Sequence, residues 1–262
     1  LYDLGVPKKV IEKPLLDLGL KDLYDLEFKE SKSCSIRGIK TKVDNTNSVP
    51  IKRNWRSIKE LILNGHLEDK LKQIIYEVFE SLANAEGKVH GIQSEDVHFH
   101  EIGAIDSLVD IIGVCSAFNY LNPKKVFCNE PMLGKGFVQT EHGKLSVPPP
   151  AVVELIRIKN IKVLKSFDSI EGELSTPTGI ALMANLVDNL QLPSKYSINS
   201  YGVGIGNLKL PFPNLVRVYK ITSFEDSSFN QNINPKCEQI SVQEALIDDQ
   251  TPEDISNFVE KL

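Results

Sequence analysis

The stretch VHFHEIGAIDSLVD, residues 97–110, concentrates side chains that could bind a metal or move a proton. His98 and His100 alternate with apolar residues, and in an extended segment alternate side chains point to the same face. The two imidazoles would project together while Val97 and Phe99 pack on the opposite face. This spacing predicts a two-histidine site for a divalent metal.

Three carboxylates follow the histidines and could complete the site. If a helix begins near Asp106, then Asp106 and Asp110 share one of its faces, and Glu101 in the preceding loop could reach the same space. Imidazole and carboxylate ligands suit nickel, zinc, iron or manganese. We take the three acids as candidate catalytic groups, either as further ligands or as the base. A structural alternative stays open, in which His100 is a core histidine and Asp106 a helix cap.

The glycine-rich stretch GKGFVQTEHGKLSVPPPA, residues 134–151, is a second candidate site. Gly134 and Gly136 would allow the backbone to approach a ligand closely, while Lys135 and His142 supply charge. We take these four residues as candidate substrate-binding groups. On local pattern alone, a glycine-rich β-hairpin followed by a helix that begins with proline explains the stretch better than a binding site does.

The segment STPTG, residues 175–179, has the pattern of a helix start. Thr176 is placed to cap the helix, and Thr178 and Gly179 would leave a hydroxyl and free amides at its N-terminus. Free N–H groups and the helix dipole favour phosphate at such a position. We therefore take these three residues as candidate substrate-binding groups, although many capped helices bind nothing.

Two further patterns are less specific. YGVGIGN, residues 201–207, lacks the following helix that a dinucleotide fingerprint needs, so it predicts a turn with close packing. Asp248 and Asp249 precede a capped helix, which suits Mg²⁺ or Mn²⁺ on a nucleotide or, alternatively, an acidic first turn.

The elements that must position these residues follow from hydrophobic periodicity. Apolar residues at helical spacing occur in residues 7–18, 57–63, 66–91, 106–121, 148–158 and 176–190. Strand patterns occur in residues 24–31, 36–43, 126–133, 162–167 and 215–221. An N-terminal hairpin and helices are thus followed by alternating strands and helices, which predicts a mixed α+β (or α/β) fold.

Composition excludes some classes of function. The 35 acidic and 30 basic side chains give a net charge of −5 without a basic stripe, so we expect no nucleic-acid partner. No apolar run approaches the roughly 18–20 residues that span a bilayer, so we expect no membrane segment. The four cysteines lack metal-site spacing and suit a reduced, cytoplasmic protein. We also expect a homo-oligomer.

The motifs VHFHEIGAIDSLVDIIG, GKGFVQTEHGKLSVPPPAVVELI, EGELSTPTGIAL and YGVGIGN, in this order, resemble the nickel insertion protein family of the lactate racemase cofactor pathway. The resemblance covers residues 1–222, and ALIDDQTPEDISNFVEKL resembles the opening of that family's nucleotide-binding domain. We therefore expect a nickel and substrate domain at 1–222 that lacks the family's N-terminal strand, a linker at 223–236, and the start of a truncated nucleotide-binding domain at 237–262.

The resemblance implies an enzyme that inserts nickel into a pyridinium bisthiocarboxylate mononucleotide and forms a carbon–nickel bond flanked by two sulfur ligands. Such a nickel insertase, or cyclometallase, belongs to the lyase class and is similar to a metal chelatase. It implies CTP with Mn²⁺ or Mg²⁺ at the second domain, near Asp248 and Asp249, and lactate racemase or a related enzyme as acceptor of the cofactor. We expect residues 1–262 alone not to turn over.

One departure from the family pattern bears on nickel. Asn54 and Trp55 stand where many members carry a histidine pair, which counts against a histidine-rich nickel store in this chain. We assign nickel to His98 and His100, because a site that delivers its metal must also release it. Two other functions stay open: a nickel chaperone that does no chemistry, and a divalent-metal hydrolase that uses the same histidines and acids.

Overall fold

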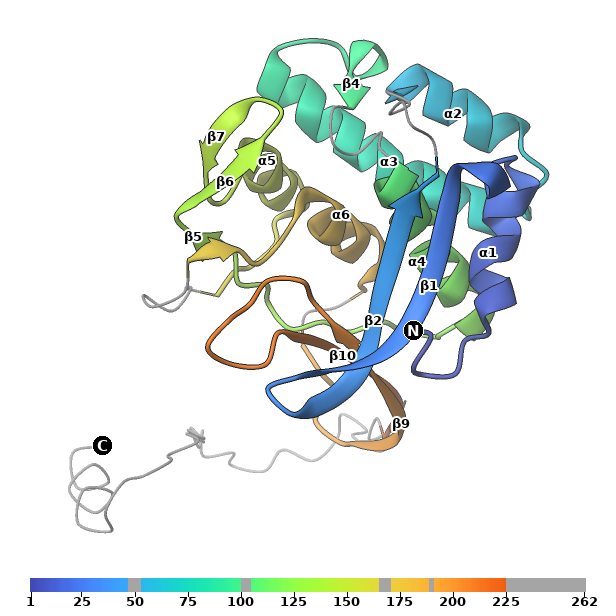
Figure 1. Cartoon of the computed structure of the whole chain (residues 1–262), viewed down its shortest axis with the longest axis vertical. Helices are drawn as coiled ribbons and strands as arrows, with labels where there is room; N and C mark the ends of the chain where they lie inside the picture. Colours follow the sequence, from blue (N-terminus) through green and yellow to red (C-terminus); the bar gives the residue numbers. More distant parts are fainter. Residues whose placement is uncertain (47–52, 100–104, 165–170, 189–190, 225–262) are drawn as a thin grey trace, which may run out of the picture. The chain divides into compact units, whose positions relative to one another are not determined.

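The computed structural model describes residues 1–46, 53–99, 105–164, 171–188 and 191–224. The chain divides into two compact units, Leu1–Glu225 and Asp226–Leu262. The described residues all belong to the first unit, which the following paragraphs concern (Figure 1). The domain boundaries expected at 222 and 236 stay predictions, and Asp248 and Asp249 lie outside the described residues.

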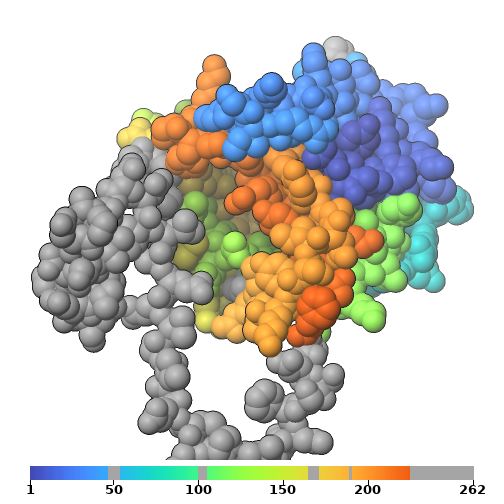
Figure 2. Space-filling model, turned by 90° about the horizontal axis from the view of Figure 1, so that it is seen from below, coloured from blue at the N-terminus to red at the C-terminus, as the bar shows by residue number. Residues whose placement is uncertain are grey.

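The main sheet joins two hairpins that are far apart in the sequence. Its strands are β1 (Tyr24–Ser33), β2 (Ile36–Asn45), β9 (Tyr196–Ile205) and β10 (Leu215–Ser223), in the spatial order β1-β2-β9-β10. Each hairpin is antiparallel, whereas β2 and β9 run parallel and pair at Ile39 and Gly204. Figure 2 shows the β1–β2 hairpin in blue next to the β9–β10 hairpin in orange. The predicted N-terminal hairpin is confirmed.

Helices pack against this sheet and against one another. They are α1 (Lys8–Asp17), α2 (Trp55–Asn64), α3 (Asp69–His90), α4 (Ile105–Leu121), α5 (Pro150–Lys159) and α6 (Pro177–Leu186), with short 3₁₀ helices at Lys21–Leu23 and Ser94–Asp96. Helix α3 contacts α2, α4, α5 and α6, and α4 contacts α1 and β2. Leu108, Ile111 and Ile112 of α4 are fully buried, as expected for a helix that is apolar on most of its faces.

Three small antiparallel pairs complete the described structure. They are β3 (Arg53–Asn54) with β4 (His98–Phe99), β5 (Gly134–Lys135) with β8 (Gly172–Glu173), and β6 (Phe137–Thr140) with β7 (Gly143–Ser146). Together with the helices they give the predicted α+β fold. Among the described helices, none combines the length and the apolar character that crossing a bilayer requires.

Two of the predicted strands differ in the structure. Residues 126–133 form no continuous strand, and Met132 makes only an isolated bridge with Leu164. Pro131 lacks the N–H that a strand ladder needs, and Val126 instead accepts and donates hydrogen bonds with Asp188. In the strand predicted at 162–167, Leu164 is the bridging residue, and residues 165–167 lie outside the described part of the chain.

The turn predicted at residues 201–207 is wrong, because most of that stretch belongs to strand β9. The close packing predicted with it is confirmed. A Cβ atom on Gly202 would lie 2.6 Å from the backbone nitrogen of Leu4, so only glycine lets β9 run this close to the N-terminal segment. The glycines therefore serve strand packing and not a change of chain direction.

Candidate functional site

A cavity of about 250 Å³ gathers three of the chain's five histidines. We call it the histidine cavity. Its ionisable residues come from α3, β4, the β6–β7 hairpin and β8, and they are Glu86, His90, His98, His142 and Glu173. Valine, leucine and proline side chains form the remaining wall. Segments that span almost ninety residues of sequence thus place imidazoles and carboxylates around one space.

The end of α3 positions His90 and Glu86. The helix stops at His90 because Gly91 adopts a left-handed conformation and its N–H closes onto the carbonyl of Gly87. Glu86 lies one turn earlier on the same face, and its Oε2 is 3.5 Å from Nε2 of His90. The side chains are 19% and 32% exposed, so both are partly shielded while they line the cavity.

The β6–β7 turn brings His142 to the same place. The N–H of His142 donates to Oγ1 of Thr140, whose hydroxyl donates to the carbonyl of Gly143, and these bonds hold the turn. The rings of His142 and His90 lie with centroids 4.9 Å apart and planes tilted by 44°. The glycine-rich hairpin predicted from sequence is confirmed, and its turn delivers a histidine to the cavity.

Strand β4 positions His98. Val97 and Phe99 are buried to 0% and 2% exposure, whereas His98 is exposed and lines the cavity. The alternation predicted for residues 97–99 is therefore confirmed. His100 and Glu101 lie outside the described residues. The pairing partner of His98 is Asn54, whose side chain caps α2 by accepting from the N–H of Ser57 at 2.8 Å.

A close contact between backbone atoms fixes the glycine-containing segment that precedes the hairpin. Gly134 and Gly136 have φ values of 86° and 91°, which favour glycine. A Cβ atom on Gly134 would lie 2.0 Å from the carbonyl oxygen of Gly172. This approach allows β5 to pair with β8, where Lys135 is opposite Gly172 and Gly134 is opposite Glu173. The close approach is to backbone and not to a ligand, and the pairing positions Glu173 beside the cavity.

Two helices begin at the histidine cavity. Pro150 opens α5 and Pro177 opens α6, and both prolines line the cavity. Oγ1 of Thr176 accepts from the N–H of Gly179 at 3.2 Å, which confirms the predicted cap. Thr178 and Gly179 follow in the first turn of α6, where the helix dipole is positive.

The described residues do not contain a complete metal cage. No three histidine, cysteine, aspartate or glutamate side chains in the described part of the chain lie close enough together to hold one ion. His98 is the described member of the predicted nickel pair.

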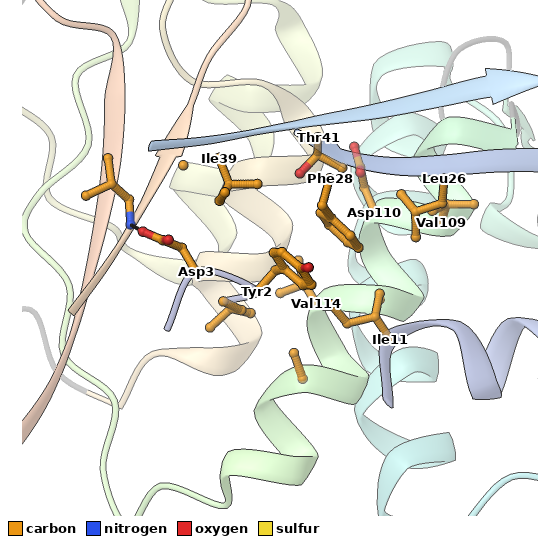
Figure 3. Close-up of a pocket in the computed structure, with 15 residues that line it drawn as sticks. Tyr2, Asp3, Ile11, Leu26, Phe28, Ile39, Thr41, Val109, Asp110 and Val114 are labelled. Carbon is orange, nitrogen blue, oxygen red and sulfur yellow. Dashed lines mark hydrogen bonds between the residues drawn. The ribbon is translucent and has the colours of Figure 1, made fainter. Parts of the chain in front are cut away.

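A second cavity, of about 150 Å³, lies between α4 and the main sheet. We call it the sheet cavity. Figure 3 shows Asp110, Thr41 and Phe28 among mostly apolar side chains that line it. The rings of Tyr2 and Phe28 stack in parallel with centroids 4.3 Å apart. Asp110 is the polar side chain that α4 places in the wall of this cavity.

The surroundings of Asp110 change its protonation. Its carboxyl opens to the sheet cavity, and the surrounding protein atoms, together with the nearby Asp106 carboxylate, raise the pKa of Asp110 to about 6. Asp106 lies in the first turn of α4, where its Oδ1 accepts from the N–H of Ser107 at 2.8 Å. The two acids interact across one helical turn, as predicted from their spacing.

Comparison with known proteins shows what kind of protein has this site. The sequence profile of the nickel insertion protein family matches residues 1–262. The chain belongs to this family.

Several curated nickel insertion proteins are similar over the whole chain. A putative nickel insertion protein of Synechococcus sp. (strain JA-3-3Ab) is 37% identical over 262 residues, with 64% of its own length covered. The pyridinium-3,5-bisthiocarboxylic acid mononucleotide nickel insertion protein of Clostridium kluyveri is 34% identical over 273 residues, with 65% covered. The chain thus spans just under two thirds of the length of these relatives. No solved structure matches it.

In this member of the family, the fold brings together some of the predicted site residues and separates others. His98, His142 and the start of α6 meet at the histidine cavity, whereas Asp110 lines the sheet cavity. Sequence reasoning did not select Glu86 or His90 as site residues. Their spacing of four is a helical ion-pair signal that could have been used.

Proposed function

We propose that the full-length protein inserts nickel into a pyridinium bisthiocarboxylate mononucleotide and so makes a nickel pincer cofactor. The observation that carries the proposal is the histidine cavity, where His90, His98 and His142 surround one space in a nickel insertion protein. The name of the Clostridium kluyveri relative supplies the substrate. Nickel is a substrate in this reaction and leaves with the product.

The histidines of the 97–110 stretch would bind nickel. His98 points to the cavity from a strand whose neighbouring residues, Val97 and Phe99, are anchored in the core. We propose that His98 and His100 hold nickel through neutral imidazoles, which suit this ion. A small set of neutral ligands also lets nickel pass to the two sulfur atoms of the substrate, which are softer ligands.

The mononucleotide would lie across the cavity with its phosphate at the start of α6. Thr176, Thr178 and Gly179 offer a hydroxyl and amides at the positive end of the helix. Pockets for drug-sized ligands are roughly 300–1,000 Å³, so a cavity of about 250 Å³ suits the pyridinium ring alone. In our proposal, His142 contacts the ring in the cavity, and Gly134, Lys135 and Gly136 bind the part of the substrate that extends beyond it.

Of the acids predicted from sequence, Glu101 and Asp106 keep their proposed roles as ligand or base. Glu101 lies outside the described residues, and Asp106 is in the first turn of α4. Asp110 lines the separate sheet cavity, where its pKa is raised to about 6, so we propose no direct contact between this carboxyl and the ring.

The remaining parts of the proposal concern the whole protein. It would be a lyase-class cyclometallase of the cytoplasm that works as a homo-oligomer and passes its product to lactate racemase or a related enzyme. CTP with Mn²⁺ or Mg²⁺ would bind at the second domain, with Asp248 and Asp249 contributing, so residues 1–262 alone would not turn over. Cys34, Cys115 and Cys128 are free thiols, which agrees with a reducing compartment.

The test is to mix full-length protein with nickel, CTP and the pyridinium substrate, and to follow the absorbance of the metallated product together with CMP. The double variant H98A/H100A should form product at least about 100-fold more slowly, because nickel is no longer held beside the ring. H66A is the matched control, since His66 is exposed and lies outside the histidine cavity.

Each alternative function predicts a different result. Full activity of H98A/H100A, with circular dichroism unchanged, would reject the nickel assignment. Stoichiometric nickel binding without any need for nucleotide would identify a chaperone. Cleavage of a phosphoester or amide without a preference for nickel would identify a hydrolase.

A further inference from the structure

We propose that His90 and Glu86 form the proton acceptor of the metallation step. This inference deepens the proposed function and rests on it. Neither residue is among the ligands and acids that the 97–110 stretch supplies. Both line the histidine cavity from the last turn of α3, and they face each other there across 3.5 Å.

The reaction itself requires such a group. Nickel held between thiocarboxylate sulfurs at ring positions 3 and 5 faces the carbon between them, and that carbon carries a hydrogen. The C–H bond breaks, its electron pair forms the carbon–nickel bond, and the proton must leave with a base. Nickel stays divalent and the ring is neither oxidised nor reduced, so the step balances with a proton acceptor alone.

The geometry suits this role in three ways. The His90 imidazole is part of the cavity wall and can take the proton directly. The Glu86 carboxylate, 3.5 Å from Nε2, balances the positive charge that then develops. His90 is also the last residue of α3, where the free carbonyl groups of the helix C-terminus favour a cation.

The other ionisable groups around the cavity come from elements other than α3. His98 comes from β4 and is assigned to nickel. Glu173 comes from β8, and the ring of His142, from the β6–β7 turn, lies tilted against that of His90. If nickel sits at His98, the ring lies between β4 and the end of α3, within one space of about 250 Å³. Asp110 lines the other cavity.

The experiment compares H90Q and E86Q in the full-length protein. H90Q should lower the rate of product formation about 100-fold or more, the usual contribution of a positioned general base, and E86Q about 10-fold. The pH dependence of the rate should differ between wild type and H90Q, because the variant lacks the proposed proton acceptor. Nickel affinity, measured by titration, should stay within about twofold of wild type in both variants.

Control variants make the result specific. E77Q alters a glutamate on the same helix that hydrogen-bonds Gln73 at an exposed position, so it should keep the wild-type rate and pH profile. A wild-type rate and pH profile in H90Q would overturn the inference. A loss of nickel affinity that matches the loss of rate would also overturn it, because His90 would then be a ligand. If wild-type protein makes no metallated product, the proposed function itself fails.

Discussion

The histidine cavity and the sheet cavity are built in opposite ways. The first collects ionisable side chains from four separate elements, and prolines at the starts of two helices close it. The second lies between regular elements, and apolar side chains surround the carboxyl of Asp110. Imidazoles beside carboxylates can accept and pass on a proton. In the sheet cavity, by contrast, the surrounding protein raises the pKa of the Asp110 carboxyl to about 6.

The two cavities also differ in what holds them. Turns and close backbone approaches shape the histidine cavity, so its geometry depends on single glycines. Packing of α4 against β1, β2, β9 and the N-terminal residues shapes the sheet cavity, so its geometry depends on side-chain volume. Substitutions of glycine and of aromatic residues should therefore act on different cavities.

The largest effect on stability is expected from G134A. Alanine would place its Cβ 2.0 Å from the Gly172 carbonyl oxygen at a left-handed φ of 86°, and relief requires that β5 and β8 move apart. We expect the free energy of unfolding to fall by about 2–4 kcal/mol in urea denaturation. G143A has a similar φ of 92° with nothing within 4 Å, so it should cost only about 1–2 kcal/mol. Equal losses would contradict the role of the β5–β8 contact.

A smaller effect is expected from F28A at the sheet cavity. Phe28 is partly buried and stacks on Tyr2, so its loss should cost about 1–2 kcal/mol in the same urea experiment. F137A is the control at the hairpin beside the histidine cavity. Phe137 is 64% exposed, and we expect a change below about 1 kcal/mol. F28A should leave nickel affinity of the full-length protein unchanged, and a tenfold loss would mean that the two cavities are coupled.

The smallest effect is expected at Asp110, which makes the free energy of unfolding depend on pH. Because the pKa is raised from 3.8 to about 6 on folding, the folded state binds the proton more tightly and wild type loses stability as pH rises between these values. D110N should abolish this loss and stabilise the protein at pH 7.5 by at most about 1 kcal/mol, since the side chain is partly exposed and solvent screens it.

Thermal unfolding from pH 4 to pH 8 measures this prediction. D106N keeps the carboxyl of Asp110 but removes its charged neighbour, so the loss of stability should move to lower pH. A wild-type profile in D110N would show that another group titrates in this range.

Local patterns predicted the parts of the fold that depend on neighbours in sequence. Apolar residues at helical spacing located the six α-helices of the described residues. Alternation predicted that Val97 and Phe99 are buried, and Thr176 caps its helix as expected. The failures have long-range causes. Val126 is hydrogen-bonded to Asp188, 62 residues away, and pairing with β10 and β2 makes most of YGVGIGN a strand.

The sequence by itself determined the family and supplied histidines, whose side chains can bind nickel. It also predicted the helix that ends near His90 and the hairpin that contains His142. These follow from composition, spacing and backbone preference, which act over a few residues. Only the tertiary structure decided that His98 shares a cavity with His90, Glu86 and His142, and that Asp110 lines another. The physical reason is that a cavity forms where elements distant in sequence fail to fill the space between them, which depends on how whole helices and strands pack.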